Sequence, residues 1–159
     1  MMISTLNFSL PGTFEFDDKS EGIGKSDSVR KCVILVVEDN VGNFKLIARL
    51  LDSLGVQCEW KTSGFEVVEF ANTISHIDLV LMDIRLPYED GYGAMRKLRQ
   101  SGQFSGIPIV AVTAVTGVDQ MKAAKMAGFD GFIGKPLDPD RFPEQIKRVL
   151  AGQSVWEYN

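Results

Sequence analysis

Five polar side chains stand where apolar runs of the sequence end. Glu38 and Asp39 follow one apolar run, Asp83 follows another, and Thr113 and Lys135 come at the ends of two more. Carboxylates bind metal ions or act as nucleophiles, a lysine supplies a positive charge to an anion, and a hydroxyl donates a hydrogen bond. If the fold brings these side chains together, their types favour the binding or transfer of a phosphoryl group.

The stretch 79–91 shows most clearly how such a residue is positioned. Four apolar residues run directly into Asp83, and Pro87 and Gly91 prevent a helix or strand from continuing through the next few positions. Asp83 is therefore expected at the carboxyl end of a strand, at the mouth of a loop. Alone it is weak support for a site, because aspartates also cap turns and helices.

Strand and helix patterns alternate from residue 32 onward. Apolar, β-branched runs predict strands and apolar residues at helical spacing predict helices. The expected strands are 32–37, 56–60, 77–82, 107–112 and 131–134. The expected helices are one carrying Phe44 to Leu54 and stopped by Gly55, 64–72 with Phe65 facing inward, 91–100, 118–127, and one carrying Phe142 to Leu150. Since Pro143 would interrupt a helix capped at Asp138, the last helix should start late or open as an irregular turn. These units predict a three-layer α/β fold with a doubly wound, five-stranded parallel sheet.

In the strand order 2-1-3-4-5 the ligand crevice lies between the first and third strands, at their carboxyl ends. That order places Glu38 and Asp39 on one side of the crevice and Asp83 on the other. Three crowded carboxylates raise one another's pKa unless a cation compensates their charge. Oxygen ligands with room for water suit Mg²⁺ better than an enclosed Ca²⁺ site.

The same crevice has groups that suit an anion. Lys135 supplies a point positive charge for a phosphoryl oxygen and Thr113 supplies a hydroxyl donor. The small side chain of Ala114 leaves its backbone N–H accessible to a phosphoryl group. Each residue also has a simpler interpretation, as a helix cap or a solvated loop residue, but independent capping does not explain their convergence on one crevice.

Composition bounds the class of protein. The chain has 159 residues, 45% of them hydrophobic, which is enough for one core and too little for two ordinary domains. A net charge of -4 lacks the basic excess of a general nucleic-acid-binding protein. Cys32 and Cys58 have neither metal-ligand spacing nor disulfide density, and no run approaches a membrane span or a signal peptide. We therefore expect reduced thiols and a cytoplasmic protein without nucleic-acid or membrane partners.

Three regions are expected along the chain. Residues 1–30 lack a clear period and are interpreted as a flexible arm, residues 31–151 form the domain, and residues 152–159 form a short tail. Trp156 and Tyr158 in the tail either fold back on the domain or mark a docking segment, with packing favoured. His76, the only histidine, is expected in a loop, which argues against a Ser-His-Asp enzyme and a histidine phosphosite.

Four short motifs carry a resemblance to a known family. They are Val36–Asn40 (VVEDN), Met82–Pro87 (MDIRLP), Val112–Ala114 (VTA) and Gly134–Pro136 (GKP). In this order and at these intervals they resemble the receiver domain of two-component response regulators, of the stand-alone, CheY-like type with a flavodoxin-like fold. The resemblance implies that Asp83 is phosphorylated by a histidine kinase or a phosphotransfer protein. It also implies that Asp39, Asp83 and the backbone carbonyl of Arg85 bind Mg²⁺, and that Glu38 holds ion-bound water.

The resemblance also assigns residues to signalling. Thr113 and Lys135 match the switch hydroxyl and the site lysine of the family, and the Lys135–Pro136 bond is cis in its members. Phe132 matches the signalling aromatic, here without the hydroxyl of the commoner tyrosine. Movement of Thr113 and Phe132 would remodel the surface of the fourth helix, fifth strand and fifth helix, through which a partner protein is addressed. Family members also form homodimers through this surface, and the sequence leaves the oligomeric state open.

The resulting expectation is a single-domain response regulator, a phosphoacceptor rather than an enzyme, with intrinsic autophosphorylation and autodephosphorylation only. The segment after Leu150 is too short for an output domain, so the output is expected to be another protein. Two alternatives remain. A haloacid-dehalogenase-like phosphatase is disfavoured because Arg85 replaces its acid-base aspartate, and a receiver-fold scaffold would act independently of phosphorylation.

Overall fold

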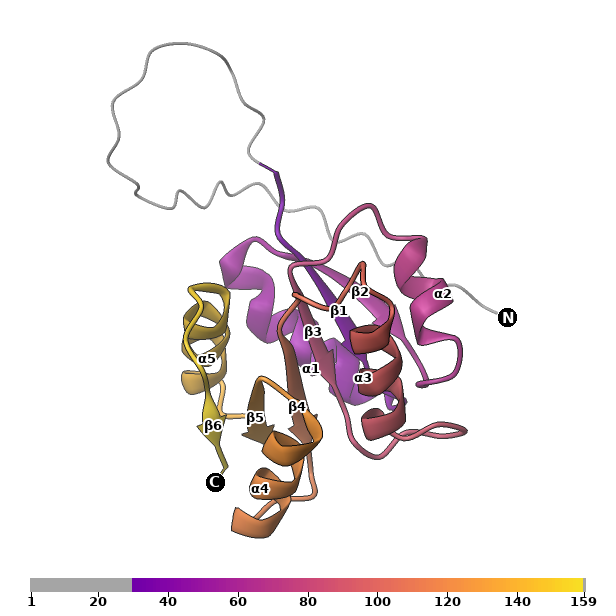
Figure 1. Cartoon of the computed structure of the whole chain (residues 1–159). Helices are drawn as coiled ribbons and strands as arrows, with labels where there is room; N and C mark the ends of the chain where they lie inside the picture. Colours follow the sequence, from indigo (N-terminus) through magenta and orange to yellow (C-terminus); the bar gives the residue numbers. More distant parts are fainter. Residues whose placement is uncertain (1–29, 159) are drawn as a thin grey trace.

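The computed structural model describes residues 30–158, so the predicted arm, apart from Arg30, lies outside the described part. A parallel sheet forms the middle layer between two layers of helices (Figure 1). The strands are β1 (Val33–Val37), β2 (Gln57–Lys61), β3 (Leu79–Met82), β4 (Ile109–Thr113), β5 (Gly131–Gly134) and β6 (Trp156–Glu157). The helices are α1 (Val41–Leu51), the 3-10 turn η1 (Asp52–Leu54), α2 (Val67–Asn72), α3 (Gly91–Gln100), α4 (Val118–Ala127) and α5 (Arg141–Leu150).

The sheet has the order β2-β1-β3-β4-β5-β6, and each pair of neighbours is parallel. This confirms the predicted α/β fold class and the order 2-1-3-4-5. The sixth strand was not predicted: Trp156 and Glu157 of the expected tail pair with Phe132 and Ile133 of β5. Trp156 packs against the core, which confirms that the end of the chain folds back on the domain.

Continuous apolar strands bury residues on both faces of the sheet. On one face, residues such as Leu35 and Val37 pack with α2, α3 and α4 in one hydrophobic cluster. On the other face, residues such as Ile34 and Val36 pack with α1 and α5 in a second cluster. Alternate side chains of β1 thus point into the two hydrophobic clusters, which explains why β1 is apolar at every position.

Local sequence fixes where the helices begin and end. The Asn40 side chain accepts a hydrogen bond from Asn43 N at 2.9 Å and caps α1. Gly55 follows η1 with a φ of 64°, a conformation that favours glycine. Helix α5 starts at Arg141, so Pro143 lies in its first turn, where no backbone N–H is required. The predicted late start of this helix is confirmed.

One helix boundary was predicted wrongly. Helix α2 begins at Val67, because Glu66 before it has a left-handed φ of 53°. Phe65 therefore lies in the preceding loop with 54% of its surface exposed, and does not face the core as expected. His76 lies in a loop, as predicted.

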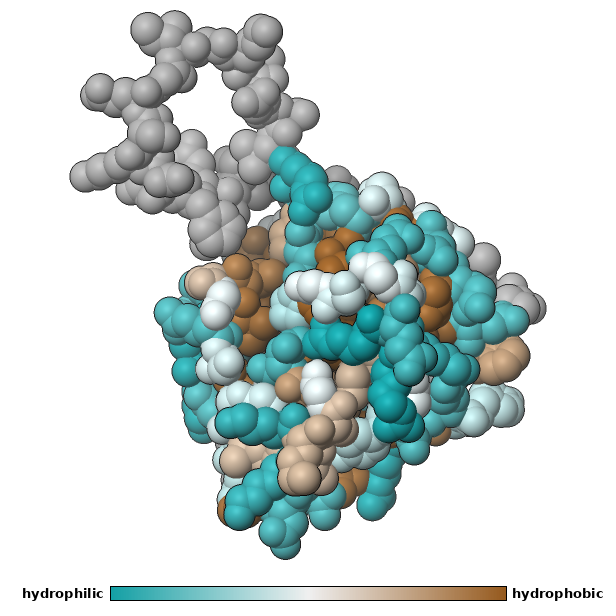
Figure 2. Space-filling model, viewed as in Figure 1, coloured by the Kyte–Doolittle hydropathy of each residue, from teal (hydrophilic) through white to brown (hydrophobic). Residues whose placement is uncertain are grey.

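The described surface is mostly hydrophilic in the view of Figure 2, with apolar side chains visible in the gaps between polar ones. None of the helices within residues 30–158 combines the length and the apolar composition that crossing a bilayer requires.

Candidate functional site

The carboxyl ends of β1 and β3 lie next to each other in the sheet, although helices and β2 separate them in sequence. Val37 and Met82 are register partners, so the residues that follow them, Glu38 and Asp83, start at the same edge. A hydrogen bond of 3.0 Å from Asp83 N to Val37 O fixes this alignment. In doubly wound sheets ligands bind where the strand order reverses, so a ligand site is expected at this edge.

Three carboxylates meet at this edge of the sheet. Oxygens of Glu38, Asp39 and Asp83 all lie within 4.8 Å of one another. Glu38 and Asp83 are buried, with 2% and 8% of their surfaces exposed, whereas Asp39 is exposed. We call these three residues, with Lys135, the acidic pocket. The structure thus brings together the carboxylates that the sequence placed on both sides of the crevice.

Lys135 is the cation that touches the buried carboxylates. Its Nζ lies 2.5 Å from Glu38 Oε2 and 2.9 Å from Asp83 Oδ2. Burial acts to lower the pKa of Lys135, but the hydrogen bonds to Glu38 and Asp83 outweigh it and the pKa is raised. The amine is therefore charged at neutral pH, and one positive charge faces three carboxylates.

Both the side-chain carboxylate and the backbone carbonyl of Glu38 accept hydrogen bonds from neighbouring residues. Its Oε1 accepts hydrogen bonds from Asn40 N at 3.1 Å and Asn43 Nδ2 at 3.4 Å, while its backbone carbonyl accepts one from Trp60 Nε1 at 2.7 Å. The Trp60 ring stacks on Phe44 with centroids 4.7 Å apart. Burial raises the pKa of Glu38, and the bonds to Lys135 and Asn40 only partly oppose it. The sequence pattern does not reveal the roles of Asn43 and Trp60, because neither is among the polar residues that directly follow an apolar run.

The loop after Asp83 packs tightly against it. Asp83 Oδ1 accepts a hydrogen bond of 3.1 Å from Arg85 N, and Gly91 N donates to Ile84 O at 2.8 Å. A Cβ at Gly91 would lie 2.3 Å from the backbone oxygen of Asp83, so any other residue would displace the loop. Tyr88 has a φ of 68°, unusual for a tyrosine, and is 93% exposed. Sequence patterning found Gly91 as a breaker but not as a packing requirement.

The remaining predicted residues lie at or near the same edge. Thr113 is completely buried at the end of β4; its carbonyl accepts a 2.9 Å hydrogen bond from Lys135 N, and its Oγ1 one of 3.3 Å from Val115 N. Ala114 follows it in an exposed position. The Lys135–Pro136 bond is cis. Phe132 is already fully buried in this structure, so its role as a switch remains a prediction.

The donor set fits a divalent cation. Lys135 neutralises only part of the charge of the three carboxylates, which gather their oxygens within 4.8 Å. Such oxygen donors, with Asp39 exposed to water, suit Mg²⁺. Asp39 and Asp83 are the side chains that would hold the ion, with the Arg85 carbonyl as a further predicted ligand and Glu38 holding ion-bound water.

Comparisons with known proteins agree with this geometry. Residues 34–147 match the response regulator receiver domain. The polar-differentiation response regulator DivK of Brucella ovis is 34% identical over 118 residues, which are 74% of this chain and 95% of DivK. DivK of Brucella anthropi is 32% identical over the same shares.

Solved structures of similar proteins have the same fold. The chemotaxis protein CheY4 of Vibrio cholerae superposes with a TM-score of 0.69 at 22% identity, covering 76% of this chain and 99% of that one, which supports the fold alone. The receiver domain of the sensor histidine kinase PA1611 from Pseudomonas aeruginosa has a TM-score of 0.66 at 32% identity, covering 77% and 97%, and holds a magnesium ion in its active-site cleft. The matched family and the DivK relatives together show that this chain belongs to the response regulator receiver domains of two-component signalling systems.

Proposed function

We propose that Asp83 accepts a phosphoryl group from a histidine kinase or a histidine phosphotransfer protein in a Mg²⁺-dependent reaction, and that the phosphorylated chain signals to a partner protein. The observation that carries this proposal is the unbalanced charge of the acidic pocket. Three carboxylates there face one ammonium group, and Asp83 is the buried carboxylate at the mouth of the β3–α3 loop. A cation and an anionic phosphoryl group would complete this arrangement.

The reaction moves one phosphoryl group between two nucleophiles. An Asp83 carboxylate oxygen forms a bond to phosphorus while the bond from phosphorus to the donor's histidine nitrogen breaks, which leaves an acyl phosphate and a neutral histidine. A bound Mg²⁺ ion supplies charge neutralisation for the phosphoryl oxygens. Lys135 pairs with a further phosphoryl oxygen, Thr113 donates its hydroxyl, and the Ala114 N–H donates from the backbone.

Exposed apolar side chains offer the donor protein a place to dock. Val41, Phe65, Tyr88 and Val118 are 50%, 54%, 93% and 47% exposed, and each follows the carboxyl end of a strand, from β1 to β4 in turn. They therefore lie in the connections at the pocket edge of the sheet rather than at its opposite edge. A donor bound there buries apolar surface and brings its histidine to Asp83.

The output is proposed to pass through the surface of α4, β5 and α5. Thr113 joins the pocket to the connection that leads into α4, and Lys135 directly follows β5. A shift of either residue on phosphorylation would reach this surface through short lengths of backbone. Both cysteines are free thiols in the structure, which supports a reducing cytoplasm as the location of the reaction.

Phosphorylation is tested with acetyl phosphate and Mg²⁺, followed by the intact mass of the protein. We expect one phosphoryl adduct on the native chain and none on Asp83→Asn or after chelation of Mg²⁺. Asp119→Asn, in the first turn of α4, is a matched control that should be phosphorylated like the native chain. A Mg²⁺-independent adduct, or one that persists in Asp83→Asn, would contradict the proposal.

Two further outcomes separate this function from its alternatives. Continuous turnover of a small phosphate ester would favour a phosphatase. Partner binding that is the same for native protein and Asp83→Asn, with and without beryllofluoride, would favour a phosphorylation-independent scaffold. We expect instead that beryllofluoride changes partner binding by the native chain only.

A further inference from the structure

The last strand of the sheet covers the surface through which output is proposed. Strand β6 lies beside β5 at the edge of the sheet and next to α5 (Figure 1). Phe132 N donates a 2.7 Å hydrogen bond to Val155 O, and only two residues of β6 are in register with β5. By comparison, four residues of β4 pair with β5. The pairing of β6 is therefore the shortest in the sheet.

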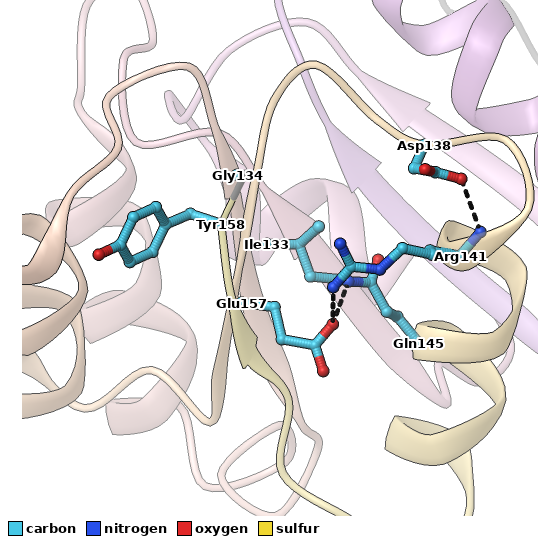
Figure 3. A pocket seen from close by; sticks show the side chains of 7 residues that line it. All are labelled: Ile133, Gly134, Asp138, Arg141, Gln145, Glu157 and Tyr158. Atoms are coloured by element: carbon cyan, nitrogen blue, oxygen red, sulfur yellow. Dashed lines mark hydrogen bonds and ion pairs between the residues drawn. The ribbon is translucent and has the colours of Figure 1, made fainter.

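Side chains of β6 and of Val155, the residue before it, complete both faces of the domain at this edge. Val155 is buried in the cluster with α1 and α5, and Trp156 packs on the opposite cluster, where Lys125 Nζ of α4 lies 5.4 Å from its ring centroid. Figure 3 shows Glu157 and Tyr158 pointing to opposite sides of the strand. This is the alternation of a strand that inserts between two helices.

Glu157 is the main polar anchor. Its Oε2 accepts hydrogen bonds from Arg141 at 3.0 Å and Gln145 at 2.6 Å (Figure 3). Its Oε1 accepts one from Arg148 at 2.6 Å. The three donors lie on one face of α5, at spacings of four and three residues. The surface beneath β6 is thus cationic on both sides, with Lys125 on α4 and two arginines on α5.

Two glycines of β5 leave the space in which β6 lies. A Cβ at Gly131 would be 2.8 Å from Val155 O, and one at Gly134 would be 2.7 Å from Tyr158 Cβ and 2.8 Å from Thr116 Cγ2. The β5 edge, by which we mean β5 with Lys125, Arg141, Gln145 and Arg148, therefore has the shape and charge to receive an extended segment in parallel register.

We propose that the β5 edge is a binding groove for an extended acidic segment of a partner protein. This segment has an aromatic residue directly before a carboxylate, and it pairs with β5 in place of β6. Once β6 has left, the β5 edge offers backbone hydrogen bonds, and the cations of α4 and α5 select the aromatic ring and the acid. Strand β6 is the resident occupant and must leave before the partner binds. This inference rests on the proposed output surface but not on the chemistry of Asp83.

The test measures binding of a fluorescent synthetic peptide with the sequence of residues 153–159 to the full-length chain. In the Glu157→Lys variant, β6 carries a lysine that faces Arg141 and Arg148. Because these like charges repel, β6 should leave the groove. We expect the peptide to bind this variant at least tenfold more tightly than it binds the native chain. A control peptide with lysine in place of the glutamate should not bind.

A second measurement shows whether β6 has left. Hydrogen exchange of the Phe132 amide, which bonds to Val155 O, should be faster in Glu157→Lys and in Gly131→Ala than in the native chain. A released strand in Glu157→Lys without peptide binding would overturn the proposal. Unchanged exchange in both variants would also overturn it, because β6 would then be a permanent strand.

A native dimer that blocks the peptide would also overturn the proposal, since a second copy of the chain would then be the occupant. The binding assay uses the unphosphorylated chain without a phosphoryl donor, so failure here is distinct from failure of phosphorylation.

Discussion

Charged side chains meet both in the acidic pocket and at the β5 edge, with opposite balances of charge. In the pocket three carboxylates are within 4.8 Å of one another and Lys135 contacts two of them. At the β5 edge a single carboxylate, Glu157, receives hydrogen bonds from two arginines and a glutamine. The pocket has an excess of negative charge, whereas Glu157 at the edge is fully supplied with donors.

This difference separates a site that awaits a ligand from one that the chain completes itself. Crowded carboxylates are tolerated only where a cation offsets their repulsion, so the pocket gains from binding Mg²⁺. At the β5 edge, Glu157 has already taken the place that an external acid would occupy. The acidic pocket can therefore bind its ligands directly, whereas a ligand of the β5 edge must first displace β6.

The largest expected effect comes from removing the cation of the pocket. Lys135→Met leaves Glu38 and Asp83 buried without their partner, and loss of one member of a buried pair costs about 3–5 kcal/mol. We expect the free energy of unfolding in Mg²⁺-free urea titrations to fall by this amount, and excess Mg²⁺ to restore part of it.

The matched control for this variant is Lys97→Met, which breaks the more exposed pair with Glu89 at 2.8 Å. Its loss should be below about 1 kcal/mol, as for other surface ion pairs. Equal losses in the two lysine variants would show that the pocket carries no special charge conflict.

Asp39→Asn tests the excess negative charge of the acidic pocket by removing a carboxylate instead of the lysine. It removes an exposed carboxylate that Mg²⁺ is expected to use, while relieving repulsion among the three carboxylates. We expect at least tenfold weaker Mg²⁺ binding by calorimetry, which corresponds to about 1.4 kcal/mol. The metal-free variant should unfold at no lower urea concentration than the native chain. Unchanged Mg²⁺ affinity would remove Asp39 from the set of ligands.

At the β5 edge a smaller effect is expected. Glu157→Gln keeps the size of the side chain but removes its charge, and charge-assisted bonds at a partly exposed site contribute about 1 kcal/mol in total. The free energy of unfolding at neutral pH should fall by that amount. A loss as large as that of Lys135→Met would mean that the two regions do not differ as described.

The pH dependence of this variant sharpens the comparison further. Hydrogen bonds from Arg148, Gln145 and Arg141 lower the pKa of Glu157 below its ordinary value of 4.5. A lowered folded-state pKa gives stability that is present above the ordinary value and is lost as pH falls through the folded one. The difference in unfolding free energy between native chain and Glu157→Gln should be constant above pH 4.5 and shrink below it. A difference that persists at low pH would exclude Glu157 as its source.

The same two regions explain what the sequence could reveal. The pocket residues stand at the ends of apolar runs, and a parallel sheet brings such ends together, so Glu38, Asp39, Asp83 and Lys135 could be placed at one site. Strand β6 could not be found this way, because two residues have no measurable period.

Some determinants become visible only in three dimensions. The pairing of β6 depends on the absence of side chains at Gly131 and Gly134, and on arginines that a helical pattern assigns only to a solvated face. Trp60 was missed, and Gly91 was recognised only as a breaker, for the same reason, since each acts by contacting the backbone of another residue, at Glu38 and Asp83. Phe65 was placed inward because the pattern does not show the left-handed turn at Glu66.

The most direct test of the account asks which of the three neighbouring carboxylates accepts the phosphoryl group. The chain is phosphorylated with acetyl phosphate and Mg²⁺, and the acyl phosphate is reduced with borohydride, which converts the modified aspartate to homoserine. Peptide sequencing by mass spectrometry then locates that residue. The account predicts homoserine at position 83 and unmodified Glu38 and Asp39; modification of either of those residues, or of an aspartate outside the acidic pocket, would contradict it.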